Sequence, residues 1–119
     1  MRDGDPAQRS DFYRKRGVVA QMTGDARAAA ESFIVALEIK PTNTAALDDL
    51  SVLARSSPDV WDFETTYREL DKLYKKRDDA NPLLARVHVG RAGFMERAGD
   101  LDGAADLYKQ ALDLAPGDF

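Results

Sequence analysis

The feature that most constrains this chain is an internal repeat. Residues 16–43 align with residues 91–118 at a shift of 75, with eight identical residues in 28 positions and no gap. Self-similarity of this kind is the signature of architectures in which one small unit is stacked on the next. The identical pairs are Arg16/Arg91, Gly24/Gly99, Asp25/Asp100, Ala29/Ala104, Ala30/Ala105, Ala36/Ala111, Leu37/Leu112 and Pro41/Pro116.

Each copy predicts two helices joined by a tight turn. In the first copy the turn is Gly24-Asp25, because glycine favours the left-handed position after a helix and aspartate caps the next one. The second helix carries apolar residues at steps of three and four and stops before Pro41. We expect Phe33, and Tyr108 in the last copy, to be the aromatic residues that fill the core between paired helices.

The segment between the copies also predicts two helices, but it matches fewer of the residues that the two copies share. Units of 34 residues fall at 10–43, 44–77 and 85–118, with 78–84 as an insertion in a single domain over 1–119. Lys75 stands where the other units have proline, so we expect the middle unit's second helix to run on to residue 78. The predicted helices are 8–22, 26–40, 44–55, 59–78, 82–98 and 101–114, with no strand.

These units resemble tetratricopeptide repeats (TPR), a 34-residue helix–turn–helix motif. The second-helix pattern is Ala-x3-aromatic-x2-Ala, then Pro, and it is met by Ala29, Phe33, Ala36 and Pro41 and by Ala104, Tyr108, Ala111 and Pro116. The middle unit is a degenerate copy. The resemblance implies an all-α fold, an α-solenoid of three antiparallel helix pairs in a right-handed superhelix. A plain antiparallel helix bundle is the alternative.

Composition narrows the class of function. The net charge of −4 and pI near 4.9 give no electrostatic reason to expect nucleic acid as a partner. The chain has no cysteine, one histidine and no long apolar run, and its first residues are polar. We therefore expect a cytoplasmic protein without membrane insertion, with no cofactor, no metal site and no enzymatic activity.

The resemblance further implies a module for protein–protein interaction, an adaptor or scaffold that binds a peptide or helix of a partner. In such stacks the first helices line a concave groove. The clamp for a chaperone's carboxylate tail is disfavoured, because Asp49 would repel the carboxylate. The register of the family gives the expected partner-binding residues as Arg14, Lys15, Asp48, Asp49, Val52, Arg55, Arg86, Val89 and Arg97.

An alternative function is self-association, as an assembly or regulatory domain of a larger protein or of a secretion or enzyme complex. Leu107, Leu112 and Leu114 leave the last helix without a polar outer face, so we expect a weak homodimer through this end. His88 is interpreted as a packed, hydrogen-bonded histidine, and Gly90 and Gly93 as sites of close helix contact. Trp61 is either a partner anchor or a packed side chain.

Overall fold

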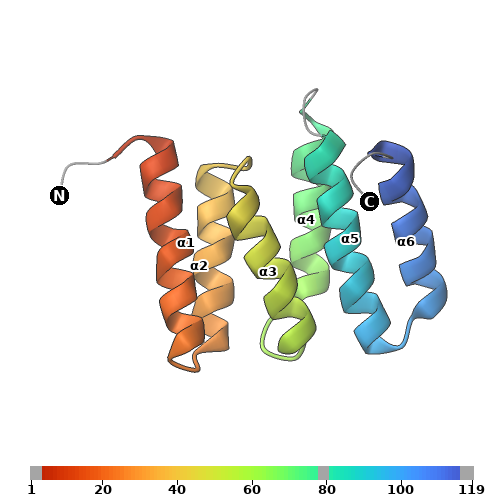
Figure 1. Cartoon of the computed structure of the whole chain (residues 1–119), viewed down its shortest axis with the longest axis horizontal. Helices are drawn as coiled ribbons and strands as arrows, with labels where there is room; N and C mark the ends of the chain where they lie inside the picture. The colour runs from red at the N-terminus through yellow and green to blue at the C-terminus, as the bar shows by residue number, and fades with distance from the viewer. Residues whose placement is uncertain (1–3, 78–80, 116–119) are drawn as a thin grey trace. The chain divides into compact units, whose positions relative to one another are not determined.

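The computed structural model describes residues 4–77 and 81–115, and every regular element in these two ranges is a helix (Figure 1). The elements are α1 Pro6–Met22, α2 Ala26–Ile39, α3 Thr44–Ser56, α4 Phe63–Lys75, α5 Asn81–Ala98 and α6 Leu101–Leu114. Neighbouring helices pack together, α1 with α2, α4 with α5 and α5 with α6. The prediction of an all-α fold is confirmed.

The chain divides into two compact units between Leu53 and Ala54. The N-terminal unit holds α1, α2 and most of α3, and the C-terminal unit holds the end of α3 with α4, α5 and α6. Each unit contains one copy of the aligned repeat, so the two copies can be compared position by position.

The two Gly-Asp turns close their helix pairs in the same way. Gly24 and Gly99 have φ of 86° and 91°, the left-handed conformation that glycine adopts without strain. Asp25 N–H donates to the Ala20 carbonyl at 2.8 Å, and Asp100 N–H donates to the Met95 carbonyl at 2.9 Å. These bonds end α1 and α5 with the Schellman arrangement.

The same aspartates begin the helices that follow. The Asp25 carboxylate accepts from the N–H of Ala28 at 3.1 Å, and that of Asp100 accepts from the N–H of Gly103 at 2.9 Å. One dipeptide thus ends one helix and starts the next in both copies, as the sequence predicted.

The N-terminal unit buries its predicted core. Phe33, Ala29, Ala36 and Leu37 have no exposed surface. The Phe33 ring lies over Gly17, where an added Cβ would be 2.5 Å from Cε1 of the ring. Phe33 is therefore the aromatic core residue that the repeat predicted.

Tyr108 is not a core residue, so that prediction was wrong. Its side chain is 38% exposed, and its hydroxyl donates to Glu96 at 2.5 Å. Ala92 stands where the first copy has Gly17, and its methyl group takes room that the Phe33 ring uses there. Leu107 fills the core instead, packed with Ala92 and Ala104.

The middle second helix is shorter than predicted at both ends. It begins at Phe63 and not at 59, because Asp62 is the cap and accepts from the N–H of Thr65 at 3.1 Å. It ends at Lys75 and not at 78, because Arg77 N–H donates to the Tyr74 carbonyl in a tight i→i−3 turn. The expected stop was at 78–82, of which 78–80 lie outside the described residues, and residues 81–84 of the predicted insertion belong to the first turn of α5.

The apolar outer face expected on α6 is only partly present. Leu107 is buried, and Leu114 is partly buried against Ala85, Ala111 and Ala115. Leu112 is 48% exposed, as predicted. The exposed apolar residues of α6 are instead Leu101, Ala105, Tyr108 and Leu112, which recur at steps of four, three and four along one side of the helix.

Candidate functional site

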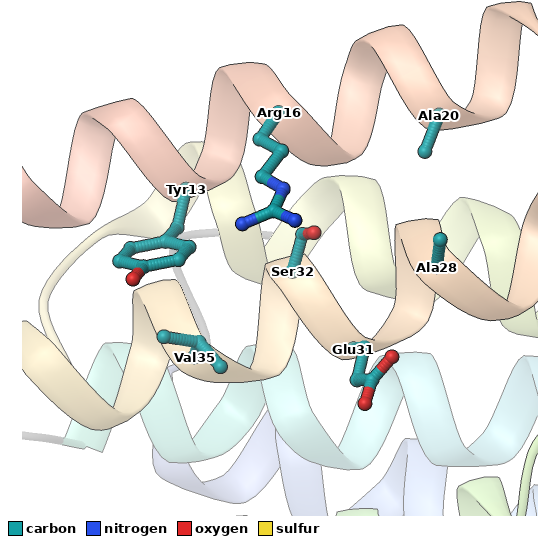
Figure 2. A pocket seen from close by; sticks show the side chains of 7 residues that line it. All are labelled: Tyr13, Arg16, Ala20, Ala28, Glu31, Ser32 and Val35. Carbon is teal, nitrogen blue, oxygen red and sulfur yellow. The ribbon is translucent and has the colours of Figure 1, made fainter.

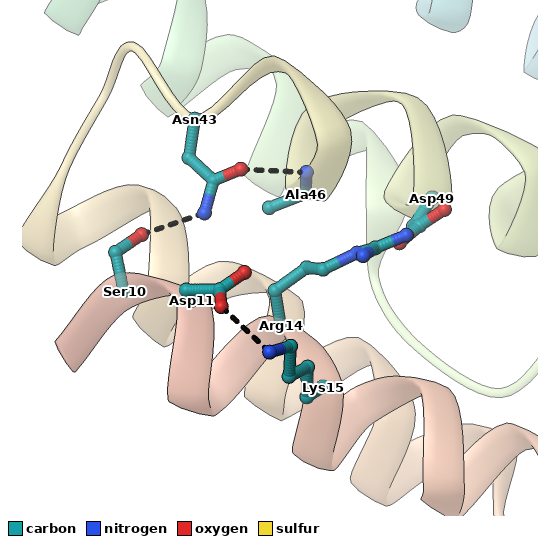
Figure 3. A network of polar contacts seen from close by, with 7 residues as sticks. All are labelled: Ser10, Asp11, Arg14, Lys15, Asn43, Ala46 and Asp49. Carbon is teal, nitrogen blue, oxygen red and sulfur yellow. Dashed lines mark hydrogen bonds and ion pairs between the residues drawn. The ribbon is translucent and has the colours of Figure 1, made fainter. Parts of the chain in front are cut away.

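In the N-terminal unit two predicted partner-binding residues meet in an ion pair. Arg14 Nε of α1 lies 2.7 Å from Asp49 Oδ2 of α3, and about a third of each side chain is exposed (Figure 3). The hydrogen bond to Asp49 is the main cause that raises the pKa of Arg14. Asp49, which the sequence analysis read as an obstacle to a carboxylate ligand, is thus the anchor that orients Arg14.

The other predicted residues of this unit surround that pair. Lys15 is exposed and forms an ion pair with Asp11 one turn earlier in α1, at 3.0 Å. Asp48 is exposed beside Asp49. Val52 lies three residues after Asp49, hence on the same side of α3, and is 50% exposed. We call Arg14, Lys15, Asp48, Asp49 and Val52 the N-terminal first-helix surface.

A chain of hydrogen bonds, which the sequence did not predict, connects the helices that carry this surface. Ser10 of α1 is fully buried, and its hydroxyl donates to the Ala36 carbonyl of α2 at 2.7 Å and accepts from Asn43 Nδ2 at 2.8 Å. Asn43 Oδ1 in turn accepts from the N–H of Ala46 and caps α3 (Figure 3). The signal in the sequence was the asparagine directly before Thr44.

In the C-terminal unit Arg55 lies against α5. The Arg55 side chain runs over Gly93, where an added Cβ would be 2.8 Å from its Cδ. The missing side chain of Gly93 thus makes room for an arginine, which is the close approach expected there. Arg55 also acts electrostatically on Tyr108, whose pKa is raised chiefly by its hydrogen bond to Glu96. Arg55, Glu96 and Tyr108 therefore share one exposed corner.

The remaining predicted residues of this unit do not gather into one site. Arg86 and Arg97 are exposed near the two ends of α5. Val89, expected as an apolar anchor for a partner, is half-buried against Ala85 and Ala111 and belongs to the packing between α5 and α6. We call Arg55, Arg86 and Arg97 the C-terminal first-helix surface.

His88 is packed, as interpreted from the sequence, but its Nδ1 has no hydrogen-bond partner among the described residues. The residue is 4% exposed, and its Nε2 lies 3.7 Å from Asp71 Oδ1 of α4. Burial is the main cause that lowers the pKa of His88, and the Asp71 charge only partly opposes it. Arg91 of α5 pairs with Glu64 of α4 next to this contact. This neighbourhood joins α4 to α5.

Two equivalent grooves lie between paired helices, and the sequence analysis found neither. The N-terminal groove has a volume of about 270 Å³ and runs between α1 and α2 (Figure 2). The C-terminal groove also has a volume of about 270 Å³ and is lined by the seven counterparts at the shift of 75, with Asp71 and Lys75 of α4 in addition. The N-terminal groove is lined by Tyr13, Arg16, Ala20, Ala28, Glu31, Ser32 and Val35.

The other side chains singled out in the sequence have local partners. Trp61 Nε1 donates to Thr66 at 3.1 Å, which fixes the indole at the start of α4. Arg68 and Lys75 pair with acidic residues one turn earlier in α4. Over residues 4–77 and 81–115, no three acidic or histidine side chains are grouped to hold a metal ion.

No model of a known protein family matches the chain, and no curated protein is similar to it. None of the six helices, as far as they are described, is long and apolar enough to cross a membrane.

Proposed function

We propose that this chain is a tetratricopeptide-like module that binds a segment of a partner protein on its first-helix surfaces and performs no catalysis. The repeat of 75 residues and the identical Gly-Asp turns support the kinship of the units. The ordered pairing of neighbouring helices is consistent with a helical repeat.

The observation that carries this proposal is Val52 beside the Arg14–Asp49 pair. A half-exposed valine next to a partly buried ion pair offers an apolar contact with oriented charges around it. Protein interfaces combine these two elements, an apolar anchor that excludes water and polar groups at its rim that fix orientation. Arg55 provides a second contact, since Gly93 holds its stem while its guanidinium can fork onto a carboxylate.

The absence of catalysis is proposed because the single histidine is engaged in packing. His88 is almost fully buried between α4 and α5, and its lowered pKa keeps it neutral at pH 7. A general base must reach the proton that it removes. On the N-terminal first-helix surface, Arg14 and Asp49 form an ion pair with each other, and Lys15 pairs with Asp11.

Selection of peptides from a phage-displayed random library on the purified chain tests the proposal. We expect peptides whose binding, followed by fluorescence anisotropy, falls at least about tenfold with Val52→Asp, a loss of about 1.4 kcal/mol. Combined Arg55→Glu and Arg86→Glu changes should weaken the binding of acidic peptides and affect the binding of neutral peptides less. Val19→Asp is the matched control, because Val19 is also more than half exposed but lies outside both surfaces. Peptides that bind all of these variants equally would exclude the first-helix surfaces.

A further inference from the structure

The C-terminal groove shows what such a groove accepts. Its walls are α5 and α6, and α4 lies along it with Asp71 and Lys75 among the lining residues. Three contacts join α4 to α5: Arg91 pairs with Glu64, His88 lies near Asp71, and the rings of Phe94 and Phe63 meet edge to face at 5.9 Å. The second helix of the preceding pair thus lies along this groove and forms a further wall of it.

The N-terminal groove is lined at the equivalent positions, of which only Arg16 is identical to its counterpart, and its lining residues all lie on α1 and α2. Tyr13 and Arg16 of α1 correspond to His88 and Arg91, and both side chains are directed toward α2 in the groove (Figure 2). The N-terminal groove is therefore a candidate binding site for a second helix.

The same comparison identifies α6 as a helix suited to this binding site. At the shift of 41 that aligns the last two units, Ala105, Tyr108 and Leu112 of α6 correspond to Glu64, Tyr67 and Asp71 of α4, which include the residues that contact α5. Tyr67 has no exposed surface, whereas Tyr108 is 38% and Leu112 48% exposed. The side of α6 that corresponds to the covered side of α4 is apolar and exposed.

α1 also has exposed apolar residues on the side that lines the N-terminal groove. Phe12 is 54% and Val19 58% exposed. Their counterparts in α5 are Val87, which is fully buried, and Phe94, which packs on Phe63 of α4. Val19 therefore occupies a position that α4 contacts in the C-terminal unit, and Phe12 occupies one that is buried there.

The charges of the two faces are complementary. α1 contains four basic residues and one acidic residue, a net charge of +3, and α6 contains one basic and three acidic residues, a net charge of −2. The pairs of Arg14 with Asp49 and Lys15 with Asp11 leave Arg9 and Arg16, which share a side of α1 with Phe12 and Val19. On α6, Asp102 and Asp113 directly follow exposed leucines.

We propose that the N-terminal groove of one copy of this chain binds α6 of a second copy, head to tail. In the register of the α4–α5 contact, Leu112 comes against Tyr13 and Ala105 against Arg16, with Asp102 one turn away as a partner for Arg16. The contact is heterologous, so each added copy brings a new open groove and a new exposed α6. This association uses no residue of either first-helix surface, although Tyr108 lies near Arg55, and it does not depend on the function proposed above.

Sedimentation velocity of the full chain, from low to high micromolar concentration, is the first test. The weight-average mass of the wild type should rise beyond that of one copy, and further than a dimer at the highest concentrations. Added salt should lower it, because the complementary charges are exposed. A wild type that stays monomeric at several hundred micromolar overturns the proposal and assigns these faces to another occupant.

Complementary variants distinguish head-to-tail contact from symmetric pairing of two α6 helices. Leu112→Glu disrupts the α6 face, and Val19→Glu disrupts the α1 face that receives it. Each variant alone should therefore be monomeric. An equimolar mixture of the two should form a dimer and nothing larger, because it contains one intact face of each kind. In symmetric pairing Val19→Glu would still dimerise and the mixture would gain nothing, which contradicts the proposal. The milder pair Leu112→Gln and Val19→Gln repeats the test if a glutamate variant loses its helical circular dichroism.

Val52→Glu is the matched control, since Val52 is equally exposed but lies on the first-helix surface. It should self-associate like the wild type while losing peptide binding. Val19→Glu should show the reverse, so each of the two proposals can fail without the other. Loss of self-association in Val52→Glu as well would contradict the assignment to α1 and α6.

Discussion

At the scale of single residues, the two copies fill the same place between paired helices in opposite ways. Gly17 has no side chain, and the Phe33 ring occupies the room that this leaves. Ala92 has a methyl group at that position, Leu107 enters the core, and Tyr108 turns outward to Glu96. In the first copy Phe33 and its neighbour Ser32 are both buried, whereas in the second copy Leu107 is buried and Tyr108 is partly exposed.

Phe33→Ala and Tyr108→Ala should therefore differ in cost. Loss of the buried Phe33 ring should lower the free energy of unfolding by about 3–5 kcal/mol, because it removes apolar contacts and leaves a cavity over Gly17. Tyr108→Ala should cost about 1 kcal/mol or less, since the side chain is partly exposed and loses one surface hydrogen bond. Urea unfolding followed by circular dichroism measures both. Equal losses would show that Tyr108 belongs to the core after all.

His88 should make the stability depend on pH between about 7.5 and 5.5. Burial lowers the pKa of His88 in the folded state, while Lys75 and Arg91 lower it further and Asp71 raises it in part. The unfolded chain, with an ordinary histidine pKa of about 6.5, therefore binds the proton first. Stability is complete above that pKa and falls as the pH drops below it, by at most about 1.4 kcal/mol per pH unit.

The measurement is the urea midpoint at pH 7.5 and at pH 5.5, for the wild type and for His88→Gln. The wild type should lose stability at the lower pH, and the variant should lose clearly less. The comparison between pH values within each protein removes the constant cost of the substitution. An unchanged pH effect in His88→Gln would assign the titration to other groups.

At the scale of elements, local chemistry in the sequence predicted most helix bounds. Five of the six helices begin and end within two residues of the predicted positions, because glycine, asparagine and aspartate mark their turns directly. The exception is α4, for which a start at residue 59 was predicted. Asp62 is the cap because its carboxylate accepts from both the N–H and the hydroxyl of Thr65.

The two Gly-Asp turns predict matched effects of cap removal. Asp25→Ala and Asp100→Ala should each lower the free energy of unfolding by about 1 kcal/mol, because each leaves a helix N–H without its acceptor. Asparagine at the same positions keeps an acceptor oxygen and should recover most of the loss. Urea unfolding of the four variants checks this. A loss with asparagine as large as that with alanine would mean that the carboxylate charge, and not the cap bond, is what matters.

The candidate site was less predictable than the helices, and the reason is the partnering of side chains. The family register placed Arg14, Asp49 and Val52 on one surface, but it could not show that the first two neutralise each other. It also assigned Val89 to a groove, although α6 packs over it. The two equivalent grooves were not predicted from the sequence, because their linings combine residues of different helices and contain no sequence motif.

At the scale of the whole molecule, the chain consists of two compact units, each with a buried core. In repeat proteins stability is approximately a sum of local terms, so damage to one unit need not spread evenly through the chain. Phe33→Ala is placed to show this, because the ring and its contact with Gly17 lie within the N-terminal unit.

Hydrogen exchange followed by mass spectrometry should show a local effect of Phe33→Ala. Amide protection in α1 and α2 should fall by at least about tenfold, and protection in α5 and α6 should fall much less. Leu107→Ala, in the core of the last pair, should give the opposite distribution. An equal loss of protection in all helices after either change would mean that the two units unfold as one.

The tight turns at Gly24 and Gly99 also have a kinetic consequence. Each joins two helices that pack directly on one another, so these tertiary contacts link residues close along the chain. Proteins with contacts of this short range fold in microseconds to milliseconds, because little loop entropy is lost before packing begins. The α1–α2 hairpin can accordingly form on the ribosome while the later helices are still being synthesised, which shortens the time for which Phe33 and Leu37 are open to misassembly.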